Sequence, residues 1–571
     1  MSYIVSMYIR TVQRKNKNGS VVRYIQLAHN QRDSNTGKPR AIVLWSFGRE
    51  EEVDREALRR LVGSINRFLG PEEVLRQEAA EGGLPLRFLE SRPLGGAWVL
   101  DHLWRRLGIG LAIDKALEQR CFRSPVERAI FAMVANRALA PASKLRVEEW
   151  VRQDVVLPGL ADVEVQQLYR AMDALLTLGD RLQEEIFCAV ASFLNLEVDL
   201  LFFDTTSTYF EIEGEDPQEG EDADYVLRRR GYSKDHRPDL AQVVIGLAVT
   251  RDGIPVRCWV WPGNTADVTR VAQVKRDLVD WRLGRVVTVV DRGFVSEDNL
   301  RTLQRAGGHY IAGERLSSGK PAVEAALSRP GRYQKVHPNV EVKEIIVGEG
   351  EARQRFVLVR NPQEEARDRA VRREILKALS EEMRGLARQP GREHSKAVCR
   401  LLAHPVYGRY LRLKQGIPEI DRAKVRAEER LDGKYLLRTS DDTLAAADVA
   451  LGYKQLLEVE EAFRTLKQTL ELRPVYHRLS RRIKAHVLLC WLALLLIRTA
   501  QVQVEEKLGK TYTWPRLREA LERMQLGFFE GPAGTVWQRT ESTSFQRQIF
   551  AALGVEEPPR FFKLDPRKQA M

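Results

Sequence analysis

The sequence contains few cysteines, and their spacing excludes two kinds of small stabilised fold. Among its 571 residues there are five, none of them in a CxxC pair: Cys121, Cys188, Cys258, Cys399 and Cys490. An odd, scattered set argues against a disulfide framework and against a zinc ribbon. Such cysteine usage is typical of a reducing cytoplasm, and we expect a cytoplasmic protein.

The chain also lacks a long apolar run. The longest, VLLCWLALLLI, spans only eleven residues, 487–497, whereas a helix needs about 20 to cross a bilayer. The N-terminus, MSYIVSMYIRTVQRK, has too short an apolar stretch for a signal peptide. We therefore expect a soluble intracellular protein without membrane contact, in which residues 487–497 form a buried helix.

Basic residues are in excess. Lys and Arg number 91 against 78 Asp and Glu, which gives a net charge of +13 and a pI near 9.4. A surplus of this size indicates a polyanionic partner, most often nucleic acid, although a merely soluble basic protein is the alternative. An apolar content of 44% is enough for packed cores. The length suggests about three or four domains.

The first part of the chain changes its pattern near residue 90. Residues 1–50 alternate between short apolar segments and turn signals such as KNKNGS and DSNTGKPR, a pattern typical of an antiparallel β meander. A helix is expected at 51–69. We predict that residues 1–90 form a domain that contacts DNA. Residues 91–195 are helical in pattern and are expected to bind DNA ends; a packing platform is the alternative.

A second change of period begins at residue 196. Apolar strand patterns and helical patterns then alternate as three strands, a helix, a strand, a helix and a strand, at 198–204, 241–250, 255–263, 267–281, 285–291, 296–306 and 309–313. This order is that of a ribonuclease H-like α/β fold. We expect its core at 196–313 and 441–510, interrupted by a mostly β insertion at 314–440. Residues 511–571 are expected to be a C-terminal tail, with dimerisation as a candidate role.

Two aspartates follow apolar strands of this core. The stretch LFFDTTSTYFE drives an apolar run into Asp204, and VVTVVD ends in Asp291. A buried carboxylate must be hydrogen-bonded, paired or bound to metal. Asp204 alone is explained as well by a turn cap through Thr205 and Thr206. Two neighbouring carboxylates repel each other, however, so their presence together indicates a cation between them.

A third acidic ligand is expected from the helical segment at 443–472. At about 100° per residue, Tyr453 and Lys467 fall within about 20° of Glu460, which lies in the middle of the apolar stripe. A glutamate on a core face is rare unless it is paired or binds metal. An ion pair from Glu460 to Arg464 is the alternative, but the two aspartates favour a metal.

These motifs resemble those of the DDE transposases of bacterial insertion sequences, in the branch marked by a YREK signature. Tyr453, Glu460 and Lys467 fall on the spacing of that signature, and Leu456 stands where its Arg is expected. Arg464, on the same helix face, is a candidate replacement. Further matching pieces are DTTSTYFE, GYSKDHRPD, GNTAD, VVDRGF and RPVYH. The resemblance covers residues 90–500.

The resemblance implies a catalytic triad of Asp204, Asp291 and Glu460 that holds two Mg²⁺ ions, which Mn²⁺ can replace. Mg²⁺ prefers carboxylate oxygens and keeps water ligands. Two ions about 4 Å apart can activate the attacking oxygen and stabilise the leaving one. Water would cut the phosphodiester at the element's end, and the freed 3′-hydroxyl would then attack target DNA.

Basic and aromatic side chains around the triad are expected to contact DNA. Lys467 is expected at the scissile or a flanking phosphate. The full set that we predict to bind DNA is Tyr453, Arg464, Lys467, Lys234, His236, Arg237, Arg473 and His477. For the three residues in GYSKDHRPD the alternative is a solvated turn. Asn264 and Thr265, in PGNTAD, either orient metal ligands or form an Asx turn that caps the next helix.

The sequence therefore predicts a cut-and-paste DNA transposase. Its partners would be double-stranded DNA, both the terminal inverted repeats of the element and the target, and it would act as a homodimer on DNA in the bacterial cytoplasm, associated with the nucleoid. Two alternatives remain. One is a structure-selective nuclease, which shares the triad but joins no ends. The other is a domesticated, catalytically silent DNA-binding protein.

Overall fold

The structure is a computed structural model of the whole chain. It describes residues 7–16, 20–32, 39–69, 87–117, 126–196, 198–212, 214–216, 226–279, 281, 285–316, 320–386, 391–531 and 534–566. The chain divides into two compact units, one formed by 1–89, 528–536 and 563–571 and the other by 90–527 and 537–562. Cys188, Cys399 and Cys490 form no disulfide, and Cys121 lies outside the described residues.

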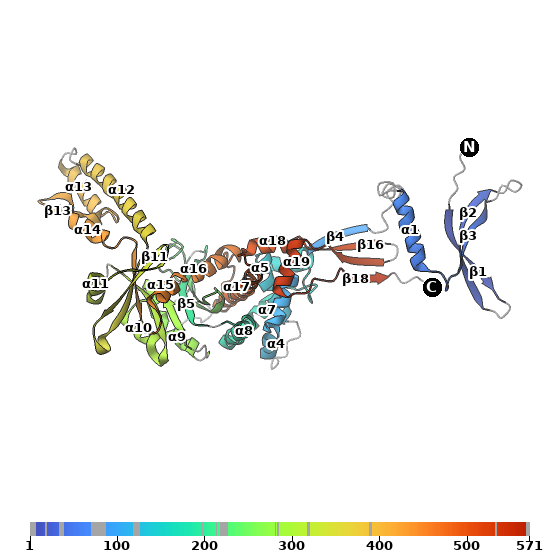
Figure 1. Cartoon of the computed structure of the whole chain (residues 1–571), viewed down its shortest axis with the longest axis horizontal. Coiled ribbons are helices and arrows are strands. Elements are labelled where there is room, and N and C mark those ends of the chain that lie inside the picture. Colours follow the sequence, from blue (N-terminus) through green and yellow to red (C-terminus); the bar gives the residue numbers. More distant parts are fainter. Residues whose placement is uncertain are drawn as a thin grey trace. The chain divides into compact units, whose positions relative to one another are not determined.

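The first unit begins with an antiparallel sheet of three strands (Figure 1). These are β1 (Met7–Lys15), β2 (Val21–Arg32) and β3 (Pro39–Arg49), and helix α1 (Arg55–Leu69) follows. The strands and the helix lie where the alternation and the turn signals of the sequence predict them.

A separate four-stranded sheet has the order β18-β17-β16-β4 and is formed by β4 (Arg87–Pro93), β16 (Gln525–Gly531), β17 (Gly534–Arg539) and β18 (Phe561–Pro566).

A helical region precedes the large sheet in the sequence. Its helices are α3 (Gly95–Arg106), α4 (Ile109–Leu117), α5 (Val126–Leu139), α6 (Lys144–Glu149), α7 (Val165–Thr177) and α8 (Gly179–Leu194). Helix α5 has no polar face, and residues all round it are buried. A helix that is apolar on all sides belongs in the centre of a core, and α5 packs there against α7 and α17 (Ser480–Leu508).

Helix α17 contains the longest apolar run and is buried, as predicted. By length and composition it would suffice to cross a membrane, but 78% of its apolar window is packed inside the protein. Such burial is usual for the central helix of a core. The segment after it is not a loose tail: α18 (Trp514–Glu522) and α19 (Ser544–Leu553) bury Trp514 and Phe550 in the same core.

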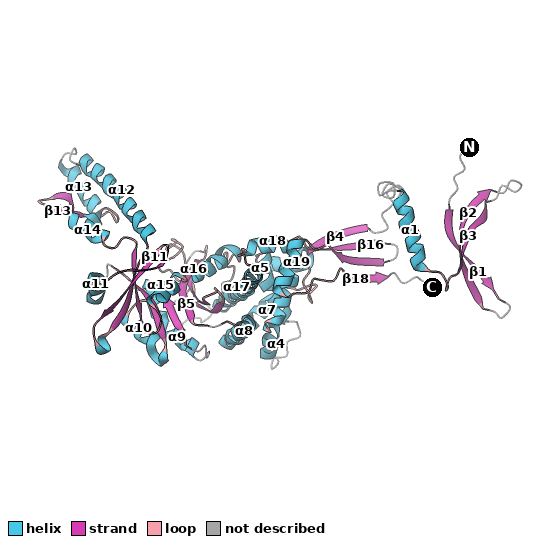
Figure 2. Ribbon diagram, in the orientation of Figure 1, coloured by secondary structure: helices cyan, strands magenta, loops and turns pink. Residues whose placement is uncertain are grey.

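The large sheet contains nine strands in the order β10-β11-β12-β15-β9-β8-β5-β6-β7, and Figure 2 separates them from the helices that flank them. Its central part consists of β5 (Leu200–Tyr209), β6 (Gln242–Thr250), β7 (Pro255–Pro262), β8 (Val287–Val290) and β9 (His309–Glu314). β5, β6 and β7 are antiparallel, whereas β8 and β9 run parallel to β5. This order and these directions fit the expected ribonuclease H-like core.

The segment 314–440 differs from the mostly β insertion that we expected. Four of its strands extend the large sheet past β9, namely β10 (Gln334–His337), β11 (Val340–Val347), β12 (Gln354–Arg360) and β15 (Lys434–Thr439). The remainder is largely helical. Helix α11 (Pro321–Ser328) packs on β11 and β12, and a separate cluster is formed by α12 (Pro362–Leu386), α13 (Gly391–Leu402), α14 (Arg422–Glu429) and a hairpin of β13 (Leu411–Lys414) and β14 (Ile417–Ile420). These charge-rich helices pack around a small apolar core that contains Leu379 and Tyr410, which their sequence pattern did not predict.

The predicted continuous helix at 443–472 is broken. It consists of α15 (Ala446–Lys454), α16 (Leu457–Arg464) and a π turn at Thr465–Thr469. The core also contains α9 (Val271–Val279) and α10 (Glu297–Gln304). A helical wheel of 100° per residue assumes one regular helix, so the predicted alignment of Tyr453, Glu460 and Lys467 no longer follows.

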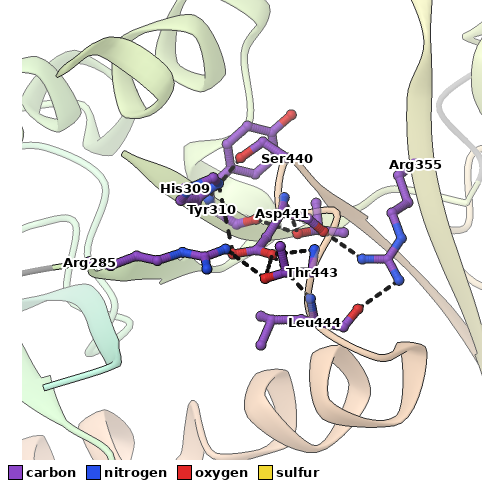
Figure 3. Close-up of polar contacts among 9 residues, drawn as sticks. Arg285, His309, Tyr310, Arg355, Ser440, Asp441, Thr443 and Leu444 are labelled. Atoms are coloured by element: carbon purple, nitrogen blue, oxygen red, sulfur yellow. Dashed lines mark hydrogen bonds and ion pairs between the residues drawn. The ribbon is translucent and has the colours of Figure 1, made fainter. Parts of the chain in front are cut away.

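Asp441 fastens the start of this helical segment to the large sheet (Figure 3). Its buried carboxylate accepts hydrogen bonds from the Thr443 N–H and hydroxyl, both at 2.8 Å, and from Arg285 Nη2 at 2.6 Å. Arg355, on β12, donates to the carbonyls of Asp441 and Leu444. Burial raises the pKa of Asp441, but these hydrogen bonds outweigh it and lower the value to about 2.

Candidate functional site

Asp204 and Asp291 are neighbours across the parallel pair of strands β5 and β8. Phe203 pairs with Val290 in the register, so the next residue on each strand is one of the two aspartates. β5 does not end at Asp204, as the sequence had suggested. It continues to Tyr209 beside β6, which excludes the alternative in which Asp204 caps a turn.

These two aspartates and Glu460 line one cavity of about 540 Å³. Tyr453 and Leu456, from α15 and the break that follows it, line the same cavity. The side chains thus come from β5, the end of β8, α15 and α16, which are far apart in the sequence. The structure brings together the three carboxylates that the sequence predicts as a triad.

The surroundings of Glu460 differ from the prediction. Glu460 is exposed at the cavity instead of lying on a core-facing stripe, and the buried face of α16 is formed by Val459, Ala462 and Phe463. The alternative ion pair with Arg464 is not formed. Arg464 is largely exposed and pairs with Glu461, and it does not line the cavity.

Tyr453 holds Asp291 in the cavity. Its hydroxyl donates to Asp291 Oδ1 at 2.9 Å. Burial, and then the nearby Asp291 carboxylate, raise the pKa of Tyr453 above its usual range. The phenol therefore stays protonated as a hydrogen-bond donor, and in the DNA-free protein its hydroxyl is committed to Asp291.

Asp204 has the electrostatics of a cation ligand. Burial raises its pKa to about 6; Lys234 and the Thr205 N–H oppose that shift, and Asp267 and Asp291 add to it. Its Oδ1 accepts from the Thr205 N–H at 2.7 Å and lies 3.5 Å from Lys234 Nζ. A carboxylate that is buried among other carboxylates gains strongly from a nearby positive charge.

Lys234 points to the acidic side chains and not to solvent, in contrast to our prediction of a DNA-facing residue. Its Nζ donates to the Thr205 carbonyl at 2.6 Å and to the Thr205 hydroxyl at 2.8 Å, and lies 3.2 Å from Asp267 Oδ2. Asp267 also accepts from the Thr205 hydroxyl at 2.6 Å. The sequence argument missed Asp267, although it belongs to the GNTAD motif.

The motifs that carry Lys234 and Asp267 are in close backbone contact at Gly231 and Gly263. A Cβ on Gly231 of GYSKDHRPD would lie 2.1 Å from the carbonyl oxygen of Gly263, in PGNTAD. The two backbones approach too closely for any larger residue. Thr265 donates its N–H to the Pro262 carbonyl, and Ala266, not Asn264, is the residue that precedes the 3₁₀ turn at Asp267–Arg270.

The remaining predicted DNA contacts fall into different environments. Lys467 and Arg473 both pair with Asp235. Lys467 Nζ lies 2.8 Å from Asp235 Oδ1, and Arg473 Nη1 lies 3.6 Å from Asp235 Oδ2. Arg237 pairs with Asp239 at 2.8 Å, and His236 is exposed at a positive φ of 57°. These residues occupy one flank of the site.

His477 is an exception, because it is buried instead of following the DNA backbone. Its ring packs against Tyr169 and His486. Burial lowers its pKa to about 3, and Lys144, Arg482 and Arg137 add to that shift. His477 is thus a neutral core residue.

The cavity suits a divalent metal by the chemistry of its donors. Carboxylate oxygens are the ligands that Mg²⁺ and Mn²⁺ prefer, and three of them line it. Within the described residues, however, no three His, Cys, Asp or Glu side chains converge closely enough to hold an ion as they stand. Asp204 and Asp291 are instead directed to Lys234, the Thr205 N–H and Tyr453.

Comparisons with known proteins address the family. Residues 9–78 match the IS1634 family transposase, N-terminal domain, and residues 207–496, half of the chain, match the Transposase DDE domain. No curated protein matches. A cryo-EM structure of piggyBac transposase in a synaptic complex with hairpin DNA is similar with a TM-score of 0.37 and 9% identity, over 76% of this chain and 82% of that one. The two family matches show that this protein belongs to the DDE transposases of insertion sequences and is a DNA transposase.

Proposed function

We propose that this transposase cuts the ends of its element and joins the 3′-hydroxyls to target DNA by a cut-and-paste route. The observation that carries the proposal is the cavity shared by Asp204, Asp291 and Glu460. Phosphoryl transfer needs positioning and charge stabilisation more than covalent chemistry. A cavity with three acidic side chains suits both hydrolysis and strand transfer, because neither reaction requires a nucleophilic side chain of the protein.

In this mechanism Asp204, Asp291 and Glu460 would hold two Mg²⁺ ions. When bound, such ions activate the attacking oxygen and stabilise the leaving oxygen of an in-line displacement. Tyr453 orients Asp291 through its hydroxyl. Lys234 lies 3.5 Å from Asp204 and offsets part of the negative charge of the neighbouring carboxylates.

The finer family assignment rests on one signature. Tyr453, Glu460 and Lys467 keep the YREK spacing, and Leu456 replaces its arginine. Leu456 is nearly buried and lines the cavity, so it offers the DNA an apolar surface at that point. We infer that the cationic contact of the YREK arginine is supplied by another residue of the cavity, which Arg292 and Lys454 line together with Leu456.

The other parts of the chain would serve the DNA. We propose that residues 1–90 and 91–195 recognise the terminal inverted repeats, that 196–313 and 441–510 carry the catalysis around the inserted segment 314–440, and that a homodimer holds the two ends. Electrostatic support comes from the net charge of +13, because a basic protein binds the phosphate backbone without regard to sequence.

The test is metal-dependent cleavage and joining on DNA that carries the gene's own flanking sequence. We expect wild type to release the element and form strand-transfer products with Mg²⁺ or Mn²⁺, and Asp291→Asn to form neither. Asp298→Asn is the control, since Asp298 lies in the first turn of α10 and does not line the cavity. Cleavage without joined products would indicate a nuclease. DNA binding without a cut under both metals would indicate a silent DNA-binding protein.

A further inference from the structure

Asp235 lies between Lys467 and Arg473, two cations that follow α16 in the sequence. Its Oδ1 accepts from Lys467 Nζ at 2.8 Å, and its Oδ2 lies 3.6 Å from Arg473 Nη1. The three side chains are 15%, 18% and 30% exposed, respectively, so this is a partly enclosed site and not a surface ion pair. Lys467 comes from the π turn after α16, and Arg473 from the extended segment beyond it.

The Asp235 carboxylate leaves part of the hydrogen-bonding capacity of Lys467 and Arg473 unused. Within the described residues, neither Asp235 Oδ2 nor Arg473 Nη1 has a hydrogen-bond partner. The Arg473 guanidinium is held over the Tyr209 ring, with its carbon 4.3 Å from the ring centre. Stacking fixes the plane of the guanidinium and leaves its N–H edge for an anion. The site is thus preorganised for an acceptor with more oxygens than one carboxylate.

We propose that Lys467 and Arg473 form a binding site for one phosphodiester of the DNA backbone, and that Asp235 occupies this site while DNA is absent. A phosphodiester carries the same single negative charge as a carboxylate and presents its oxygens in a tetrahedral arrangement. It can satisfy an ammonium and a guanidinium together through charge-assisted hydrogen bonds. The inference rests on the proposed function for its ligand, and it adds a residue, Asp235, that must leave.

The loop that carries Asp235 is bonded to β5 just before this residue and closed on itself around it. The Lys234 N–H donates to Ser207 Oγ at 2.9 Å, and the Arg237 N–H donates to Ser233 Oγ at 3.1 Å. Rotation of the Asp235 side chain alone would therefore vacate the cations, with the backbone left in place. The preceding residue, Lys234, contacts Asp204, so the phosphate site and the catalytic carboxylate are served by adjacent residues of one loop.

The test is the affinity of the full-length protein for a fluorescent duplex that carries the gene's flanking sequence, measured without divalent metal. Asp235→Asn removes the competing charge and keeps the shape of the side chain. We expect it to bind the duplex about tenfold more tightly than wild type, because the phosphate no longer displaces a carboxylate. In a Lys467→Met background the same change should gain less than about threefold, because one of the two cations is missing.

The matched control is Asp199→Asn, which changes the charge equally just before the N-terminal end of β5, where Asp199 pairs with the exposed Arg251. We expect it to change the affinity by less than about twofold, since exposed pairs contribute little. An unchanged or weaker affinity of Asp235→Asn, or a gain no larger than that of the control, would overturn the proposal.

Lys467→Met alone keeps the test valid if Asp235→Asn does not fold. We expect a loss of affinity of about tenfold or more, because the phosphate loses one of its two cations while the negative charge of Asp235 remains beside the DNA. An unchanged affinity of Lys467→Met would also overturn the proposal. A wild-type protein that binds no duplex at all would instead contradict the proposed function.

Discussion

The carboxylates and the cations of this site are held in different ways. Asp204 and Asp291 follow paired residues of two buried, parallel strands. Lys467 and Arg473 lie in a π turn and in an extended segment, and the carboxylate that pairs with them comes from a loop. The acidic half is therefore positioned by the core of the sheet, whereas the basic half is positioned by ion pairs, which we propose a DNA phosphate replaces.

This difference explains why the two halves should respond differently to substitution. A change in the acidic half removes groups for which the sheet offers no substitute. A change in the basic half alters a balance between an internal carboxylate and an external phosphate. The first should abolish chemistry, and the second should shift DNA affinity in either direction.

The largest expected effect is on Glu460. Glu460→Gln should lower the rate of DNA cleavage by about 10³-fold, in the range found when one transition-state-stabilising group is removed. The adjacent Glu461→Gln removes an exposed carboxylate of the same helix that pairs with Arg464. It should retain a rate near that of wild type. Equal losses in the two variants would show that the helix and not the cavity-facing carboxylate matters.

An intermediate effect is expected at Asp441, which holds the sheet and α15 together. Its pKa of about 2, against a usual 3.8, shows that the folded protein favours the charged form. Asp441→Asn should lose about 2 kcal/mol of stability near neutral pH. A folded pKa below the unfolded value gives stability that is present above pH 4 and lost as the pH falls toward 2. The gap between wild type and variant in thermal unfolding should shrink accordingly on acidification.

At Tyr453 the expected loss of cleavage rate is smaller than at Glu460. Tyr453→Phe removes the hydrogen bond to Asp291 and keeps the ring in the cavity wall. A hydrogen bond to a charged group contributes about 1.5–3 kcal/mol, so cleavage should slow by about tenfold to a hundredfold. A rate equal to that of wild type would show that Asp291 needs no such support.

The sequence predicted that Asp204 and Asp291 lie together, and the reason is physical. Apolar runs that lead into Asp204 and Asp291 indicate buried strands, and parallel neighbours in an α/β sheet bring the residues that follow them together. The order of strands and helices along the chain followed from the same periodicity. Glu460 was placed in the right cavity, although for a reason that the broken helix does not support.

The basic half could not be derived in this way. The break after Lys454 and the π turn at Thr465–Thr469 arise from tertiary packing, which no helical period records. The orientations of Lys234 and Asp235 depend on a loop held by Gly231, Ser207 and Ser233. The charge pattern of 363–388 likewise gave no sign that its helix belongs to a small core of its own.

The central claim is that the three carboxylates hold the catalytic metal. Its most direct test is Asp291→Cys, assayed for DNA cleavage with Mg²⁺ and then with Mn²⁺. A thiolate is a poor ligand for Mg²⁺ and a better one for Mn²⁺. The account predicts that cleavage is lost with Mg²⁺ and regained in part with Mn²⁺. A wild-type rate with Mg²⁺, or the same residual rate with both ions, would contradict it.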